Sequence, residues 1–499
     1  MEGARTVAIV PEASALVESL RGLGYSTETA LADLIDNSIS ARASRIDIDA
    51  QWRDGAPVFA VLDDGEGMDE AGLAAALRFG GDGPSAVRAQ TDLGRFGMGL
   101  KTASLSQCRR MTVVSRHEGK TAALVLDIDV IAAAGWVALV PDMLPDHPLM
   151  QKLAAQDQGT LVCWEAIDTR SGLTGLNREA FFLRLIDIRA HLSMVFHRFL
   201  AGEARRLAIA VNERLLKPWD PFQRQHPATK PLGTIPLRLN GRKLIVRPWV
   251  LPHRDRFANE AEYVEAGGPG GWGARQGFYI YRGDRLLVAG SWLALGGSRA
   301  WTREESSRLA RIEVDLPTDL DDEWRIDVRK SQARPPGELR ARLTQIAGDC
   351  RNAAREVFAF RGRRMGGVPT ARAPDPVWLA HDVQTGTRYA VNRKHPAVAA
   401  FLETTGVSPT LLNGLLTLIE QTVPVERIWL DVTDAEGAPD PAPQADAVEE
   451  LATRLAGLGA ALPKDLSAAA RVDILLANMN EPSPALRIRL TDLLEGADA

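Results

Sequence analysis

Three short motifs between residues 33 and 101 constrain the fold of this chain more than any other feature. In chain order they are Asp33-Leu-Ile-Asp36-Asn37, Asp63-Asp-Gly65-Glu-Gly67-Met68 and Gly94-Arg-Phe-Gly97-Met-Gly99-Leu-Lys101. Asp33 and Asn37 are four residues apart, so on a helix their side chains share one face and can reach the same ligand. The other two motifs are turns, whose glycines permit a positive φ or a close approach of the backbone to a ligand. Together the motifs predict one nucleotide pocket.

The third motif has the composition of a phosphate-binding turn. Its glycines leave backbone N–H groups free to point at a triphosphate, most effectively if a helix begins at Leu100. Lys101 would add a mobile positive charge at the same place.

The first two motifs supply the remaining chemistry. Asn37 offers a neutral amide oxygen that suits Mg²⁺, a hard ion that keeps several waters. Asp33, one turn earlier, can orient or deprotonate an attacking water. The Asp63 carboxylate can accept a hydrogen bond from the amino group of adenine, which guanine does not offer at that place.

The three motifs resemble the N box, G1 box and G2 box of the GHKL ATPases, a superfamily that includes gyrase B, a heat-shock chaperone, histidine kinases, MutL and the MORC proteins. Gly159-Thr160 resembles a fourth element, a Gly-Thr pair near the adenine. The sequence from Gly97 to Ala103 is most similar to the corresponding segment of MORC proteins and their bacterial relatives. One departure is that the family's catalytic Glu is Asp33 here, shorter by one methylene, which implies slow hydrolysis.

The resemblance implies an ATPase that uses ATP and Mg²⁺, with a defined set of site residues. It assigns catalytic roles to Asp33 and Lys330 and a metal-ligand role to Asn37. The nucleotide-binding set that it implies is Asn37, Asp63, Gly65, Gly67, Met68, Gly94, Arg95, Phe96, Gly97, Met98, Gly99, Leu100, Lys101 and Thr160.

The expected fold class is α/β (α+β): a GHKL-type ATPase sandwich, a βαβ transducer domain and a mainly helical C-terminal extension. The expected parts are an ATP-binding domain over 1–174, a transducer over 175–370, a hairpin and helical segment over 371–433, a Pro-rich linker over 434–446 and a helical region over 447–499. With 499 residues, 45% of them hydrophobic, the chain can bury two or three cores.

Local patterns predict several elements. Ser26 or Thr27 followed by Glu28 indicates the start of the helix that carries the first motif. Residues 45–52 alternate, and Asp54-Gly55 indicates a hairpin turn into the strand 58–62. Residues 80–92 contain few apolar side chains, which fits either a mobile lid or a plain surface loop.

The resemblance continues into the second half of the chain. Residues 191–197, 218–222 and 277–286 look like segments of a MORC-type transducer, with expected strands at 207–211 and 277–281 and a helix over 337–360. Lys330 falls in a loop before that helix, where the family places a Lys that reaches the γ-phosphate. The alternative is a solvated surface lysine.

The distribution of charge along the chain suggests which partners it could bind. The whole chain has a net charge of −5, but residues 329–372 contain ten Arg and one Lys against three acids, a local charge of +8. This segment could follow the phosphate backbone of double-stranded DNA. Equally, it could be a helix face that pairs with acidic neighbours.

Several other classes are not favoured. His191 and His197 come after the ATP motifs, whereas histidine kinases usually place the phospho-acceptor helix before them, so core or surface histidines are the better interpretation. Cys108, Cys163 and Cys350 are scattered and lack metal-ligand spacing, which fits a reducing cytoplasm. No secretory signal or apolar stretch of about 18 residues occurs, so no membrane association is expected.

The sequence therefore favours an ATP-operated clamp that forms a homodimer when ATP is bound. The resemblance implies action on DNA, in a phage-defence or restriction-type context with operon-encoded partner proteins. The alternatives are a non-hydrolysing ATP-dependent scaffold and, more weakly, a chaperone-like protein.

Overall fold

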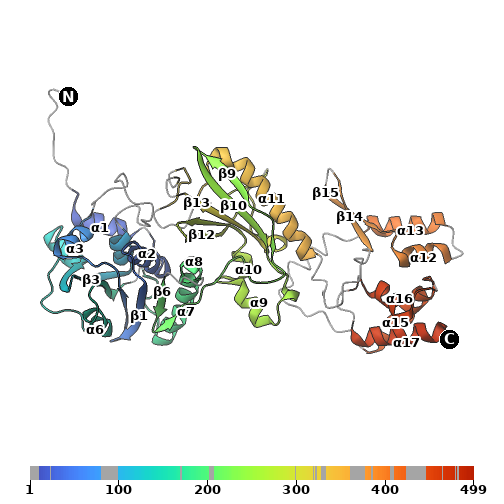
Figure 1. Ribbon diagram of the computed structural model, residues 1–499, viewed down its shortest axis with the longest axis horizontal. Helices are drawn as coiled ribbons and strands as arrows, with labels where there is room; N and C mark the ends of the chain where they lie inside the picture. Colours follow the sequence, from blue (N-terminus) through green and yellow to red (C-terminus); the bar gives the residue numbers. More distant parts are fainter. Residues whose placement is uncertain are drawn as a thin grey trace, which may run out of the picture. The chain divides into compact units, whose positions relative to one another are not determined.

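A computed structural model describes most of the chain in two compact units, residues 1–364 and 365–499. The described residues are 11–22, 24–79, 99–168, 171–201, 207–297, 299–317, 320, 323–327, 333–359, 377–383, 386–404, 409–422, 445–463, 465–477, 479 and 483–498. Within these ranges, no helix has both the length and the apolar character needed to span a membrane. The mixed α/β fold class expected from the sequence is confirmed (Figure 1).

The first lobe of the first unit is built on a seven-stranded sheet with the strand order β4-β3-β5-β2-β1-β6-β7. Its strands are β1 (Arg45–Arg53), β2 (Ala56–Asp63), β3 (Cys108–His117), β4 (Lys120–Asp127), β5 (Gly159–Ile167), β6 (Ala208–Val211) and β7 (Arg214–Leu215). Its helices are α1 (Ala13–Arg21), α2 (Thr27–Ser40), α3 (Glu70–Leu77), α4 (Gly99–Gln107), α5 (Ile128–Ala134), α6 (Pro148–Ala154), α7 (Arg178–Val195) and α8 (His197–Leu200).

Alternation along β2 divides the two faces of this sheet. Phe59 and Val61 enter the main core, which also contains apolar residues of α1, α2, α4 and α7. Ala60 and Leu62 face the other way and pack with Leu149 of α6. The period of two in the sequence therefore produces a sheet covered by helices on both faces.

The local predictions for the first motif and the hairpin are confirmed. Ser26 caps α2, and β1 pairs antiparallel with β2. Asp54 and Gly55 both have positive φ, 49° and 80°, as a tight hairpin turn requires.

The second lobe contains a six-stranded sheet with the order β12-β11-β13-β10-β8, and β9 pairs with β10. Its strands are β8 (Lys230–Pro231), β9 (Ile235–Leu239), β10 (Arg242–Val250), β11 (Gly277–Arg282), β12 (Arg285–Ser291) and β13 (Ala310–Leu316). Its helices are η2 (Arg254–Arg256), α9 (Glu260–Gly267), α10 (Gly271–Ala274), η3 (Glu305–Ser307) and α11 (Gly337–Ala359), which lies along the sheet (Figure 1).

Strand β11 joins the two lobes. Tyr279 and Tyr281 enter the core of the first lobe, whereas Phe278 and Ile280 enter the core under α11. The two lobes therefore pack on opposite faces of one strand.

One assignment of the sequence analysis needs correction. Residues 207–211, expected as a strand of the transducer, form β6 and pair in parallel with β1 of the first sheet. Phe181, Leu185 and Phe222 also belong to the first core. The expected boundary at 174/175 thus separates α7 and β6 from the sheet and core to which they belong.

The second unit begins with the predicted hairpin, β14 (Trp378–Val383) and β15 (Gly386–Val391). Its helices are α12 (Pro396–Thr404), α13 (Pro409–Gln421), α15 (Ala445–Ala460), α16 (Ala468–Leu476) and α17 (Pro484–Asp498). The expected linker over 434–446 lies outside the described residues, except for its last two positions, which begin α15.

Candidate nucleotide site

Helix α2 forms the first wall of the candidate site. Its start is fixed by Ser26 Oγ, which accepts a hydrogen bond from Thr29 N at 3.3 Å. Asp33 is 3% exposed, and Asn37 follows one turn later. In the described part of the chain, the buried Nδ2 of Asn37 has no hydrogen-bond partner. A buried polar group without a partner is costly, so the Asn37 amide fits a site that a ligand completes.

The start of helix α4 lies beside Asp33. A Cβ built on Gly99, the first residue of α4, would lie 3.9 Å from Asp33 Oδ2. The first N–H groups of a helix have no partner within the helix and attract anions. The Asp33 carboxylate therefore lies beside the N-terminus of α4, with Asn37 one turn further along α2. A phosphate group and a hard metal ion could both be bound near these groups.

Lys101 differs from the expected mobile charge. It is 2% exposed, and its Nζ donates to the Ala76 carbonyl oxygen at 2.8 Å. The ammonium group also lies 5.9 Å from the centroid of the Phe79 ring. Burial lowers the pKa of Lys101 from 10.5 to about 8. The lysine is a fixed cation in the first turn of α4.

Asp63 ends strand β2, and its carboxylate is held by donors from the protein. Ser38 Oγ of α2 donates to Oδ2 at 2.7 Å, and Gly65 N donates to Oδ1 at 3.0 Å. Burial raises the pKa of Asp63, while these bonds and one from the Thr160 backbone oppose the rise. Because a carboxylate offers about four acceptor positions, Asp63 can accept one further donor, such as an exocyclic amino group.

Thr160 and Met68 are brought to Asp63 by the sheet. Asp63 is opposite Thr160 in the β2–β5 pair, and Thr160 is opposite Ser115 in the β5–β3 pair. The hydroxyls of Ser115 and Thr160 lie 2.8 Å apart, and Met68 N donates to Ser115 Oγ at 2.8 Å. Sequence reasoning missed both Ser38 and Ser115, because only strand order and helix packing bring them to the motifs.

The glycines of the second motif are required by close packing. Gly67 has a φ of +66°, and a Cβ there would lie 1.9 Å from the Arg116 carbonyl oxygen. A Cβ on Gly65 would lie 2.8 Å from the Ala41 carbonyl oxygen. The turn therefore lies directly against the backbone of two neighbouring segments, which fixes its position beside Asp63.

Tyr25, which directly precedes the Ser26 cap of α2, is influenced by charges from both lobes. Burial and then the Asp33 carboxylate raise the pKa of the Tyr25 hydroxyl, and the charge of Asp327 contributes in the same direction. Asp327 lies three positions before Lys330 in the sequence. Lys330 lies outside the described residues, as do Gly94, Arg95, Phe96, Gly97 and Met98 of the third motif.

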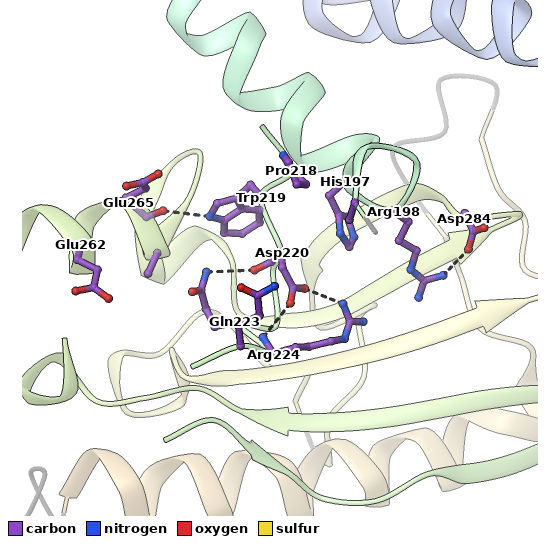
Figure 2. A pocket seen from close by; sticks show the side chains of 13 residues that line it. His197, Arg198, Pro218, Trp219, Asp220, Gln223, Arg224, Glu262, Glu265 and Asp284 are labelled. Atoms are coloured by element: carbon purple, nitrogen blue, oxygen red, sulfur yellow. Dashed lines mark hydrogen bonds and ion pairs between the residues drawn. The ribbon is translucent and has the colours of Figure 1, made fainter. Parts of the chain in front are cut away.

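A cavity of about 740 Å³ lies between the two lobes of the first unit, and none of its lining residues belongs to the motifs (Figure 2). It is lined by parts of α8, the segment 218–225, α9 and Asp284. Its size would suit a small molecule. The nucleotide site predicted from the sequence motifs is therefore a different place from this cavity.

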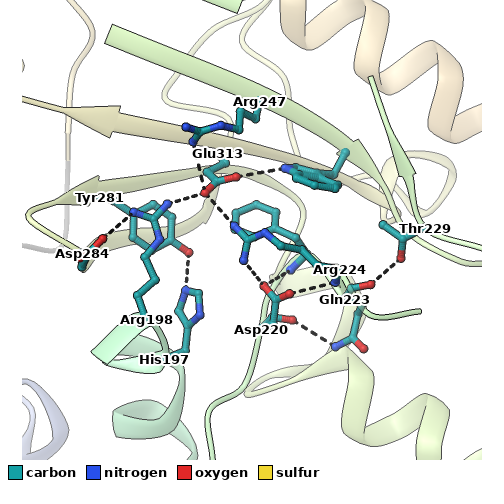
Figure 3. Close-up of polar contacts among 12 residues, drawn as sticks. His197, Arg198, Asp220, Gln223, Arg224, Thr229, Arg247, Tyr281, Asp284 and Glu313 are labelled. Atoms are coloured by element: carbon teal, nitrogen blue, oxygen red, sulfur yellow. Dashed lines mark hydrogen bonds and ion pairs between the residues drawn. The ribbon is translucent and has the colours of Figure 1, made fainter. Parts of the chain in front are cut away.

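The arginines of the cavity are already neutralised by acids behind it (Figure 3). The Glu313 carboxylate, 3% exposed, pairs with Arg198 and with Arg224, the latter at 2.7 Å. It also accepts a hydrogen bond from Trp249 Nε1 at 3.2 Å, and Arg198 pairs with Asp315 at 2.6 Å. The network links α8 of the first lobe to β13 of the second and leaves little positive charge for an anionic guest.

Of the two histidines, His197 is a core residue and His191 is partly buried. His197 is 2% exposed, and its Nε2 lies 2.8 Å from the Tyr281 hydroxyl. Burial, with smaller effects of Arg198 and Arg224, lowers the pKa of His197 to about 3. Burial likewise lowers the pKa of His191 to about 3. Both are neutral at pH 7.

A family match covers the part of the chain that contains α2, β2 and α4. Residues 25–160 match a family described as histidine kinase-, DNA gyrase B- and HSP90-like ATPases. The mouse protein ATPase MORC2A and the human protein ATPase MORC2 are each 37% identical to the chain over 102 residues. The aligned stretch is 19% of this chain, and the chain spans only 10% of the length of these two relatives.

Proposed function

We propose, from the GHKL-type, MORC-like ATPase domain that this chain carries at residues 25–160, that the protein is an ATP-operated clamp. The observation that carries the proposal is the position of Asp33 beside Gly99 at the N-terminus of α4, one turn before Asn37, whose buried Nδ2 has no partner among the described residues. ATP binds with adenine at Asp63 and with its phosphates toward α4.

Asn37 is the proposed protein ligand of Mg²⁺. Its amide oxygen is a hard neutral donor, and Mg²⁺ takes few protein ligands besides waters and phosphate oxygens. The ion, when bound, neutralises phosphate charge. Asn37 Nδ2, which lacks a partner in the described part of the chain, remains available to an acceptor on the nucleotide or its water shell.

Asp33 is the proposed general base. Asp33→Ala should keep ATP binding but lose hydrolysis, because the carboxylate acts on water rather than on the nucleotide. Asp33→Glu should preserve or raise the rate, because it restores the family's longer side chain. Steady-state phosphate release measures both variants, with ATP affinity as the control, and an Asp33→Ala protein as fast as the parent would remove Asp33 from this role.

Lys330 is the proposed γ-phosphate sensor of the second lobe. The effect of Asp327 on the Tyr25 pKa supports this role, because Asp327 precedes Lys330 by three residues and its charge acts next to the start of α2. Nucleotide state would then be relayed to the second lobe when the γ-phosphate is lost.

The whole protein is proposed to act as a cytoplasmic homodimer that closes on ATP and engages DNA through residues 329–372, in a phage-defence or restriction-type context with operon-encoded partner proteins. The similarity to the proteins named ATPase MORC2A and ATPase MORC2 supports the ATPase part of this proposal. Gel filtration with light scattering, with and without Mg²⁺ and a non-hydrolysable ATP analogue, tests the closure. An unchanged monomer mass with bound analogue would contradict it.

The second candidate is a scaffold that binds ATP without hydrolysing it. The observation that favours it is the presence of Asp33 in place of the family's glutamate. A carboxylate shorter by one methylene must reach further to the water. ATPase activity measured with and without DNA separates the two functions, because a scaffold should show no turnover in either condition. The chaperone-like alternative has no comparable feature in its favour.

A further inference from the structure

One buried ion pair ties the helix that carries Asp33 and Asn37 to the second lobe. Asp36 Oδ1 on α2 accepts a hydrogen bond from Arg285 Nε at 3.0 Å, and the two side chains are 1% and 4% exposed. The partners are 249 residues apart in the sequence. Leaving one member of such a buried pair unmatched is strongly destabilising, so the contact strongly favours one placement of α2.

Arg285 is held in place by contacts with both lobes. It is the first residue of β12, its guanidinium lies 5.1 Å from the centroid of the Phe196 ring, and its Nη1 donates to the Leu286 carbonyl oxygen. The preceding residue, Asp284, lies 3.5 Å from Arg198 of the Glu313 network (Figure 3). The β11–β12 turn therefore presents the guanidinium to Asp36 from an anchored position.

The position of Asp36 on α2 links its ion pair with Arg285 to the candidate nucleotide site. Asp36 directly precedes Asn37 and lies three residues after Asp33, so all three share less than two turns of one rigid helix. A rotation or shift of α2 that breaks the Asp36 contact also moves the other two side chains. Displacements of about 1 Å at a reacting centre can cost about a hundredfold in rate.

We propose that Arg285 is a positioning residue of the nucleotide site. It sets the rotation of α2 through Asp36, and thereby the placement of Asp33 and Asn37, without touching the nucleotide. The hydrolytic site is complete only while the second lobe is packed against α2. This inference rests on the proposed ATPase function and adds to it a structural requirement for the second lobe that is distinct from Lys330.

The test compares Arg285→Gln, Asp36→Asn and the double variant in the full chain. In Arg285→Gln, kcat should fall by about ten- to a hundredfold, and the Mg²⁺ concentration for half-maximal binding of a non-hydrolysable ATP analogue should rise. The affinity for ADP without Mg²⁺ should change by less than about threefold, because Asp63 holds the adenine. The double variant should recover thermal stability, since no unpaired buried charge remains, but its kcat should stay close to that of the single variants.

Arg351→Gln is the matched control. Arg351 is also a nearly buried arginine, 3% exposed, and it pairs with Glu304 at 2.8 Å in the second lobe. Its loss should lower the melting temperature and leave kcat unchanged when the assay is run well below the unfolding transition. If Arg285→Gln does not fold, Arg285→Lys and the double variant carry the same comparison.

Two outcomes would overturn the proposal. One is a folded Arg285→Gln, or Arg285→Lys with the double variant, that hydrolyses ATP as fast as the parent. The other is a double variant whose kcat recovers together with its melting temperature, which would mean that the pair only stabilises the fold. A parent protein that does not bind ATP at all would instead overturn the proposed function itself, and this inference with it.

Discussion

At the residue scale, Asp63 provides the sharpest test of the nucleotide pocket. Asp63→Asn should weaken ATP binding about ten- to a hundredfold, because an amide cannot accept at both ends from Ser38, Gly65 and the adenine amino group. Losing a charge-assisted bond in a buried site costs about 1.5–3 kcal/mol. Isothermal titration calorimetry measures the change, and an unchanged dissociation constant would contradict the assignment of the pocket.

The neighbouring Asp64 offers a matched control for that variant. Its Oδ1 accepts hydrogen bonds from Ser44 N and Arg45 N, both at 2.8 Å, so it supports the chain rather than a ligand. Asp64→Asn makes the same change of charge one residue away. It should lower the free energy of unfolding somewhat and leave ATP affinity within about twofold of the parent.

The pKa of Lys101 predicts a link between nucleotide binding and protons. Burial lowers this pKa from 10.5 to about 8, so the charged form is disfavoured in the folded protein. The folded state gains stability relative to the unfolded state as the pH rises from about 8 toward 10.5, because the unfolded chain binds more protons there. A triphosphate beside α4 would favour the charged form again, so ATP binding near pH 8 should take up a proton at Lys101.

Calorimetry in two buffers with different ionisation enthalpies measures this proton uptake. The parent should show a buffer-dependent heat at pH 8, and its ATP affinity should fall as the pH rises above 8. Lys101→Met should lose the part of the effect that belongs to the lysine. Equal proton uptake by the two proteins would mean that Lys101 does not sense the phosphates.

The same scale shows where sequence reasoning reached its limit. Asp63 and Asn37 could be proposed because their motifs are local, and Ser38, which follows Asn37 on α2, donates to the Asp63 carboxylate. Ser38 and Ser115 were missed because single serines carry no pattern. Their roles depend on the order β2-β5-β3 and on the packing of α2, which bring distant residues together.

At the scale of elements, local patterns predicted the start of α2, the β1–β2 hairpin and the bounds of the long helix α11 to within one or two residues. Capping and turn chemistry act over a few positions and can be read directly. Strand β6 was placed in the wrong lobe because a four-residue strand shows its own period and not its partner. The contact of Arg285 with Asp36 spans 249 residues and has no local signal.

The relay between lobes can be tested at Lys330. Lys330→Ala should reduce the hydrolysis rate and the closure induced by ATP, while leaving ADP binding nearly unchanged, because only the γ-phosphate is within its proposed reach. Parallel titrations with ADP and with a non-hydrolysable ATP analogue measure the difference. Equal weakening for both nucleotides would show that the lysine does not read the γ-phosphate.

At the scale of the whole molecule, the arginines of the basic region 329–372 fall into two groups. Within α11, Arg351 and Arg355 both pair with Glu304 at 2.8 Å, so part of the local charge of +8 is used inside the lobe. The arginines at 361, 363 and 364 lie outside the described residues. If DNA is a partner, these three are better candidates for phosphate contacts than the arginines paired on α11.

A salt titration decides whether nucleic acid is the partner. Duplex binding should be largely independent of sequence and should weaken steeply with salt, with a slope of about −0.9 per neutralised phosphate. Replacing Arg361, Arg363 and Arg364 with Gln should flatten the slope by about three units while ATP binding stays intact.

The control replaces three exposed arginines of the second unit and should keep the parent's slope. These are Arg454, Arg487 and Arg489, each paired with an acid. Fluorescence anisotropy provides the readout. Equal slopes for the parent and the first variant, or no binding at low salt, would favour the protein scaffold, since the basic segment would then have no phosphate backbone to follow.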